Sequence, residues 1–511
     1  MFTKVNSGGI WAVKGMLVSV EADVSDGLPS FSISGQLASE VKESQERVRT
    51  ALKNSGYRLP AKRITVNLSP AGLRKGGTAY DLPIAAAVLG AFEKLPTDWF
   101  ADSMIIGELG LDGRVKPVSG ILPLAAMAKE YGLRRIFLPE ENAEEGMVVE
   151  GIRIVGIRSL RHLAELLEKK EDDVYVPRKN SAACPDPEIG MDLDFCQVNG
   201  QRVLKRAAEV AAAGMHGLLL TGSAGTGKTM VAKRIPTILP HLTREEAIDI
   251  SRIYSVCGLL PPGQPLLGHR PFRSPHHTIT VQALAGGGNP PKPGELSLAS
   301  GGVLFLDELP HFRREAVELL RQPLEERKIT VTRVSGSYEF PADFMLVAAM
   351  NVCPCGFYPD RSRCRCTEHQ IRQYLCHISR PILERFDIWA EAAAVTFGEL
   401  GMRQKENETS ASIRERVEMA RERQERRLKG TGIRFNSRMG VKETEQFCQL
   451  GKEEQKLAKR LYDSGRLSAR RYHKTLKVAR TIADLEGSED IKREHLAEAL
   501  NYGGLEERIW G

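Results

Sequence analysis

The chain has 511 residues, too many for one ordinary domain, and this length predicts about two to four. Hydrophobic residues make up 42% and charged residues 27%, which is typical of a globular protein in water, and no apolar run is long enough to cross a membrane. The first residues lack the features of a signal peptide, so we expect a cytoplasmic location and no membrane partner. The net charge of +7 permits binding to nucleic acid but does not establish it.

Residues 1–168 alternate between strand-like and helix-like segments. The pattern predicts strands at 16–20 and 64–68 and helices at 40–55 and 81–92. Such a mixture predicts an α+β domain at the start of the chain.

The remaining residues divide into three parts. Charges, prolines and polar residues predict a linker over 169–195. Residues 196–390 alternate strands and helices, the pattern of an α/β core with a mostly parallel sheet. Residues 391–511 are predicted to be helical, with Asp490 as the N-cap of the last helix. The expected fold class is multidomain α/β with a C-terminal α-helical domain.

A phosphate-binding loop is the strongest functional motif. The pattern G-x-x-x-x-G-K-[ST] is matched at every fixed position by Gly222, Ser223, Ala224, Gly225, Thr226, Gly227, Lys228 and Thr229. It follows an apolar run and precedes a helix-like segment, as the motif requires. Its glycines let backbone N–H groups converge on a phosphate at a helix N-terminus. Lys228 can reach the β- and γ-phosphates and Thr229 can bind Mg²⁺, so ATP and Mg²⁺ are the expected cofactors.

Two further strands end in residues suited to nucleotide hydrolysis. The apolar run 303–306 ends in Asp307 and Glu308. Asp307 would hold Mg²⁺, and Glu308 would act as general base toward the attacking water. The run 345–350 ends in Asn351, which could lie beside the γ-phosphate.

The order of these motifs resembles the AAA+ ATPases. That resemblance implies that Asn351 is the sensor 1 residue, that Arg385 is the arginine finger, and that Arg470 is the sensor 2 arginine contacting the γ-phosphate. In this superfamily the finger reaches the site of the neighbouring subunit. The resemblance therefore implies a ring, most often a homo-hexamer, with residues 391–511 as a helical lid.

Other segments narrow the resemblance. The sequence Arg273-Ser274-Pro275-His276-His277, the segment 293–299, and a predicted hairpin at 329–340 with Gly336 at its tip resemble the magnesium-chelatase-like branch. Residues 1–505 resemble the ComM/YifB family of competence proteins. That family implies an ATP-driven hexameric DNA helicase that promotes branch migration in homologous recombination during natural transformation. DNA, single-stranded or branched, is the implied partner, and recombination proteins are further candidates.

The resemblance also implies a Lon-protease-like first domain, with the fold of the second domain of ribosomal protein S5. Residues 107–120 carry this similarity. Lon enzymes need a serine nucleophile and a lysine that activates it. Ala79 stands at the expected serine and Leu122 at the expected lysine, which predicts that proteolysis is lost. The domain would then serve assembly or DNA binding.

Four of the nine cysteines form a C-x-C…C-x-C pattern: Cys353, Cys355, Cys364 and Cys366. Four thiolates at this spacing can wrap a tetrahedral Zn²⁺, and the alternative is a set of reduced thiols that pack the loop. Because the loop joins Asn351 to Arg385, a metal there could stiffen the link between the nucleotide and the subunit interface.

Two other functions and one further surface remain open. The motor could assist insertion of Mg²⁺ into a porphyrin, or the chain could be an ATP-switched assembly scaffold. The arginine-rich segment 403–438 is predicted to be a solvated, ion-paired helix, with a DNA-binding face as the alternative.

Overall fold

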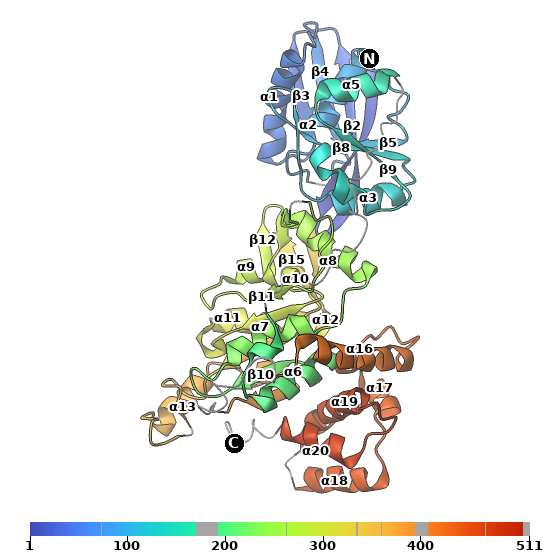
Figure 1. Ribbon diagram of the computed structural model, residues 1–511. Helices are drawn as coiled ribbons and strands as arrows, with labels where there is room; N and C mark the ends of the chain where they lie inside the picture. The colour runs from blue at the N-terminus through green and yellow to red at the C-terminus, as the bar shows by residue number, and fades with distance from the viewer. Residues whose placement is uncertain are drawn as a thin grey trace.

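The computed structural model describes residues 1–72, 74–169, 193–261, 263–333, 336–358, 360–393, 407–464 and 467–503, arranged as three parts one above another (Figure 1). The predicted linker 169–195 lies almost entirely outside these ranges. None of the described helices combines the length and the apolar character that crossing a bilayer requires.

The first part is built on a seven-stranded mixed sheet of order β3-β4-β2-β1-β5-β8-β9. The strands are β1 Phe2–Trp11, β2 Lys14–Ser25, β3 Ser30–Ser34, β4 Arg63–Ser69, β5 Ser103–Ile105, β8 Arg135–Pro139 and β9 Arg153–Ile157, with the short pair β6 Glu108–Leu109 and β7 Val115–Lys116. The helices are α1 Ser39–Asn54, α2 Asp81–Ala91, α3 Ile121–Glu130, α4 Ala143–Gly146 and α5 Leu160–Lys169.

The predictions for this part are confirmed, with the strands longer than expected. Strand β2 is longer than predicted because the alternation between buried and partly exposed residues, which a half-buried strand requires, continues over most of the range 14–25. Helix α2 is buried at all 11 positions. It is therefore the helix around which the first part packs.

The second part is a five-stranded sheet in the order β11-β14-β17-β10-β18, and every neighbouring pair is parallel. Its strands are β10 Leu218–Thr221, β11 Phe272–Arg273, β14 Val303–Leu306, β17 Met345–Met350 and β18 Ile388–Glu391. Every residue of β10, β14 and β17 is buried, as expected for parallel strands covered on both faces. The predicted parallel core is confirmed.

Helices and short strands surround this sheet. The helices are α6 Arg202–Gly214, α7 Lys228–Ile238, α8 Arg244–Cys257, α9 Val281–Ala285, α10 Glu295–Leu298, α11 Arg314–Glu318, α12 Arg321–Glu326, α13 Glu368–Leu375 and α14 Arg380–Leu383. Two antiparallel ribbons are formed by β12 Gly286–Gly288 with β13 Pro291–Pro293 and by β15 Lys328–Arg333 with β16 Gly336–Pro341.

The second ribbon confirms the predicted hairpin but corrects its tip. Gly336 pairs with Arg333, so it is the first residue of β16. The residues between the two strands, 334 and 335, lie outside the described ranges.

The third part is helical, as predicted. It contains α16 Ser410–Arg427, α17 Val441–Phe447, α18 Lys452–Asp463, α19 Ala469–Leu485 and α20 Arg493–Asn501. The last helix begins later than expected. Its N-cap is Lys492, and Asp490 lies before it, where its carbonyl oxygen accepts a hydrogen bond from Ser488.

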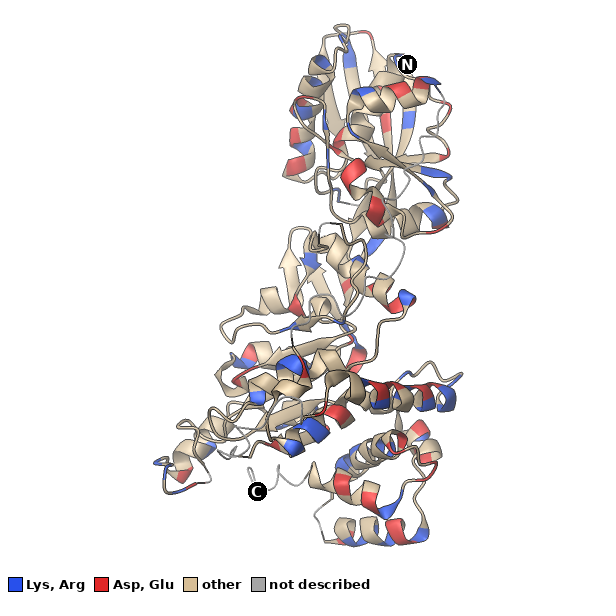
Figure 2. Cartoon of the chain, viewed as in Figure 1, with Lys and Arg blue, Asp and Glu red and all other residues tan. Residues whose placement is uncertain are grey.

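Acidic and basic residues alternate along α16 (Figure 2). Arg421 pairs with Glu425 at 2.8 Å, and Arg426 pairs with Glu422 at 3.1 Å, each one turn apart. The predicted ion-paired helix is confirmed for this stretch. Most of its positive charge is therefore matched by carboxylates of the same chain.

The first part touches the second through the turn between β1 and β2 and through α3. Trp11 stacks on Tyr338 of β16, with ring centroids 4.1 Å apart. The backbone N–H of Gly120 donates to the carbonyl oxygen of Ser255 at 3.0 Å, at the end of α8. The first part is thus held against the hairpin β15–β16 by aromatic packing and against α8 by a hydrogen bond.

Candidate nucleotide site

The phosphate loop connects the buried strand β10 to α7. Gly227 has φ +86° and immediately precedes the helix, which begins at Lys228. Gly222 has φ +142°, and a Cβ there would lie 2.9 Å from the Cβ of Ala392. Both positions therefore require glycine, one for the turn and the other for close packing. The loop thus leads directly into the N-terminus of α7, and backbone N–H groups at a helix N-terminus bind phosphate.

Lys228 is the central cation of this site. The residue is only 8% exposed, and its Nζ donates to the carbonyl oxygens of Gly222 at 2.9 Å and Ser223 at 2.7 Å. It also donates to Oδ1 of Asn351 at 3.1 Å. Burial lowers the pKa of Lys228, while the charge of Asp307 acts in the opposite direction. The loop and the end of β17 thus meet at one ammonium group.

The expected Mg²⁺ ligands also meet. The Thr229 hydroxyl donates to Oδ2 of Asp307 at 2.8 Å, close enough for both oxygens to hold one Mg²⁺. Glu308 follows with φ +54° in the left-handed region, and its side chain is exposed. A non-glycine residue in this region is strained, and such strain is typical of functional sites. The residues fit ATP with Mg²⁺ at this edge of the sheet.

Arg385 lies at the opposite edge of the same sheet. It precedes β18, and a Cβ on Gly217 would lie 2.6 Å from the carbonyl oxygen of Arg385. Gly217 is the residue before β10, whereas the phosphate loop follows β10. The four residues of β10 separate the two ends, roughly 13 Å at the usual rise of a strand. Arg385 forms an ion pair with Glu325 and does not reach the phosphate loop of its own chain.

Arg470 lies beside Arg385. It is the second residue of α19 and pairs with Glu384, and both arginines line a cavity of about 360 Å³ together with Lys474 and Lys477. The burial of Arg385, followed by the nearby charge of Arg470, lowers the pKa of Arg385. Arg470 therefore lies with Arg385, away from the phosphate loop of its own chain, and its contact with the γ-phosphate stays a prediction.

A buried polar network that sequence patterns do not signal links this edge to the helical part. His216 is fully buried, and its Nδ1 lies 3.0 Å from Oδ2 of Asp387. Its Nε2 lies 2.9 Å from the Thr481 hydroxyl. Burial opposes ionisation of Asp387, but the charge of Lys474 and the hydrogen bond from His216 leave its pKa below the ordinary value. No motif marks His216, because its partners are far away in the sequence.

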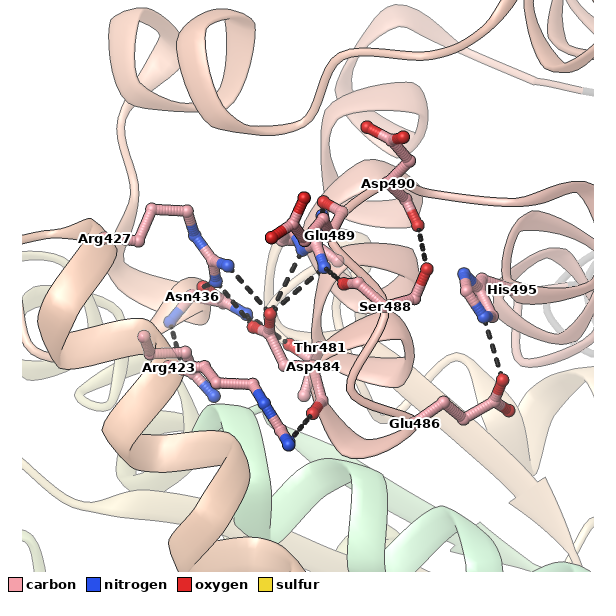
Figure 3. Close-up of polar contacts among 12 residues, drawn as sticks. Arg423, Arg427, Asn436, Thr481, Asp484, Glu486, Ser488, Glu489, Asp490 and His495 are labelled. Atoms are coloured by element: carbon pink, nitrogen blue, oxygen red, sulfur yellow. Dashed lines mark hydrogen bonds and ion pairs between the residues drawn. The ribbon is translucent and has the colours of Figure 1, made fainter.

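The network continues to Asp484 (Figure 3). Asn436 donates to Thr481 at 3.0 Å and to Asp484 at 2.8 Å. Arg427, at the end of α16, donates to both carboxylate oxygens of Asp484 at 2.7 and 2.5 Å. Because the Asp484 side chain is only 1% exposed, these contacts neutralise a buried charge.

The four cysteine sulfurs lie within 4.8 Å of one another. The Sγ of Cys353 is 3.4 Å from that of Cys355 and 3.8 Å from that of Cys364, and the last two are 3.5 Å apart. A tetrahedral Zn²⁺ with Zn–S bonds of about 2.3 Å separates its sulfurs by about 3.8 Å, whereas a disulfide requires about 2.05 Å. The spacing therefore fits a four-coordinate metal.

The expected protease positions hold no dyad. Ala79 and Leu122 have no nucleophile or base, and Leu122 is fully buried. The nearby polar groups have other partners, since Lys75 donates to the carbonyl oxygen of Pro70 and Thr78 to Glu108.

The parallel sheet and the site at its edge define a nucleotide-binding α/β protein of the AAA+ class. Comparison with known families agrees. "Subunit ChlI of Mg-chelatase" matches residues 20–142, "Magnesium chelatase, subunit ChlI" matches 194–400, and "Magnesium chelatase, subunit ChlI C-terminal" matches 407–503.

Relatives span nearly the whole chain. Competence protein ComM of Haemophilus influenzae is 39% identical over 505 residues, which cover 98% of this chain and 97% of ComM. Protein YifB of Escherichia coli is 40% identical over 489 residues, 96% of this chain and 94% of YifB. The chain therefore belongs to the ComM/YifB family. Lon protease 2 of Bacillus subtilis is 28% identical over 141 residues, which cover 27% of this chain and 25% of the protease.

The Asp484 network leads to a stability prediction. Replacing Arg427 by Ala should lower the free energy of unfolding by about 2 kcal/mol, because Asp484 loses two charge-assisted hydrogen bonds and keeps Arg480, 3.2 Å away, as its remaining cation. The matched control is Arg426→Ala, whose pair with Glu422 is exposed on both sides, and it should cost less than about 1 kcal/mol. Urea unfolding followed by circular dichroism measures both. Equal losses in the two variants would contradict a special role for Asp484.

Proposed function

We propose that this protein is an ATP-hydrolysing motor that works as a homo-hexameric ring on DNA in the cytoplasm. It would promote branch migration in homologous recombination, as the family resemblance implies, with natural transformation as the expected setting and recombination proteins as further partners. The observation that carries the proposal is the division of the catalytic residues. Lys228, Thr229, Asp307 and Asn351 gather at one edge of the sheet, and Arg385 lies at the other.

This division supports a ring because one chain holds an incomplete site. Arg385 has a partly buried guanidinium whose Nε has no hydrogen-bond partner among the described residues. A neighbouring chain packed edge to edge would bring Arg385 and Arg470 to the phosphates bound at Lys228. An arginine supplied in this way stabilises the charge that develops on the transferred phosphoryl group.

When bound, ATP with Mg²⁺ supplies the phosphoryl group and neutralises part of its charge. Each group of the chain then has a defined task. The loop and Lys228 bind the phosphates, Thr229 and Asp307 hold the metal, and Glu308 accepts a proton from the attacking water. Asn351, held by Lys228, orients that water.

The DNA partner is supported by the near full-length similarity to a protein named for competence. The hairpin β15–β16 also presents the exposed side chains of Thr332 and Arg333.

The magnesium-chelatase family matches favour a second candidate, a motor that assists insertion of Mg²⁺ into a porphyrin. An ATP-switched scaffold is the third. Only the DNA motor should respond to branched DNA, whereas the chelatase motor and the scaffold should not.

We expect branched DNA to stimulate ATP hydrolysis by the full-length protein and to be rearranged only with hydrolysable ATP. Glu308→Gln should lower the hydrolysis rate by about 10²–10⁴-fold, because the general base is lost, while ATP binding and assembly persist. Phosphate release and a gel assay of a labelled four-way junction measure the two activities. Hydrolysis indifferent to DNA would favour the chelatase, and absence of hydrolysis would favour the scaffold.

Action of Arg385 on a neighbour can be tested by mixing subunits. Arg385→Ala and Lys228→Ala should each lower hydrolysis by about 10³-fold or more. Mixed rings should regain part of the activity, because some interfaces then pair an intact loop with an intact arginine. Arg380→Ala, an exposed arginine nearby, should stay close to wild type. If the mixture hydrolyses ATP no faster than the sum of the two variants measured separately, the site is not shared between subunits.

We also propose that the four-cysteine cluster holds a structural Zn²⁺. The sulfur spacing supports this, and Cys353 and Cys364 are buried, which suits a closed tetrahedral site.

Metal analysis of the purified chain should find one zinc per chain, held by four thiolates. Cys364→Ser should lose most of the metal, and Cys376→Ser, an exposed cysteine outside the cluster, should keep it. Metal content that does not change with Cys364→Ser would place the zinc elsewhere.

A further inference from the structure

The cysteine loop touches the phosphate loop directly. The backbone N–H of Ala224, inside the phosphate loop, donates to the carbonyl oxygen of Gly356 at 3.3 Å. Gly356 belongs to a turn in which its N–H donates to the carbonyl oxygen of Cys353 at 3.0 Å. The turn 353–356, which contains the first two cysteines, therefore lies directly beside the nucleotide site.

Close packing accompanies this hydrogen bond. Gly356 has φ +80°, and a Cβ there would lie 3.3 Å from the Cβ of Ala224 and 3.5 Å from Nδ2 of Asn351. Asn351 is in turn the acceptor for Lys228 at 3.1 Å. One turn of backbone thus contacts both the loop that binds phosphate and the side chain predicted to sense it.

The second cysteine pair ties this turn to another element. Cys366 lies just before Thr367, which caps α13 through a hydrogen bond from the N–H of Gln370 at 3.2 Å. Cys353 and Cys364 pack in the same hydrophobic core as Ile371 and Leu375 of α13. A metal bound by all four sulfurs would fix the Gly356 turn against α13.

We propose that the metal-bound cysteine cluster is a brace that sets the geometry of the phosphate loop and Asn351, so that metal occupancy controls the affinity for nucleotide. The proposal rests on the zinc site and on ATP binding proposed above, but not on DNA or on branch migration. It assigns the cluster a task beyond folding its own loop. The hydrogen bond from Ala224 to Gly356 is the contact through which the brace acts.

The critical variant is Gly356→Ala, which keeps all four cysteines, places a methyl group 3.3 Å from the Cβ of Ala224 and strains the turn that makes the contact. It should retain zinc and bind a fluorescent ATP analogue, with Mg²⁺, about fivefold more weakly, because the displaced turn weakens the hydrogen bond from Ala224, and one hydrogen bond contributes about 1 kcal/mol. The matched control is Gly430→Ala, a glycine with a similar φ of +86° and open space around its Cβ position. It should leave both zinc content and affinity unchanged.

Metal removal tests the same idea without a substitution. Treating the full-length protein with a zinc-selective chelator in excess Mg²⁺ should weaken binding of the analogue by a similar factor, and added Zn²⁺ should restore it. Unchanged affinity in the zinc-free protein, or in Gly356→Ala, would overturn the brace while leaving the zinc site in place. A purified protein without zinc would overturn both. Because every readout is taken without DNA, failure of the motor function gives a different pattern: normal nucleotide binding with no response to branched DNA.

Discussion

The parallel direction of the strands in the five-stranded sheet is the constraint on which the rest of the structure depends. Because β10, β14 and β17 run the same way, their carboxyl ends meet at one edge, and the residues that follow them must lie together. Thr229 reaches Asp307, and Lys228 reaches Asn351, for this reason. The same polarity places the residues before β10 and β18 at the other edge. Arg385 is therefore separated from the phosphate loop by the fold itself.

This constraint explains which parts of the site could be predicted from the sequence. An apolar run followed by a carboxylate or an amide is a local pattern, and the direction of parallel strands converts it into proximity in space. The expectations for β14 with Asp307 and for β17 with Asn351 needed no other information. The position of Arg470 could not be predicted in this way, because the position of α19 depends on packing between distant segments. Its local pattern identifies an arginine near a helix start but does not specify the edge of the sheet.

The features that could not be predicted depend on contacts across long sequence distances. His216 and Asp387 are 171 residues apart, and no motif includes His216 or indicates that the two side chains meet. The contact between Gly356 and Ala224 is made by backbone atoms, which leave no trace in residue type. The predicted start of α20, with Asp490 as the N-cap, was wrong for a local reason. His495 accepts from the N–H of Lys492 where glutamate or glutamine usually does so, and the pattern around Asp490 looked more like a cap.

The buried network between the sheet and the helical part determines which segments can move together. Asp387 lies two residues after Arg385 and is joined through His216 and Thr481 to Asp484. Each hydrogen bond to a buried carboxylate such as Asp484 contributes about 1.5–3 kcal/mol, so breaking every link in each catalytic cycle would be too costly. The segment that carries Arg385 and the helices α16 and α19 should therefore move as one body. Strand β10 already joins the phosphate loop to Gly217, which contacts the backbone of Arg385. The cysteine loop lies between Asn351 and Arg385 in the chain and is a second covalent route between the two ends of the sheet.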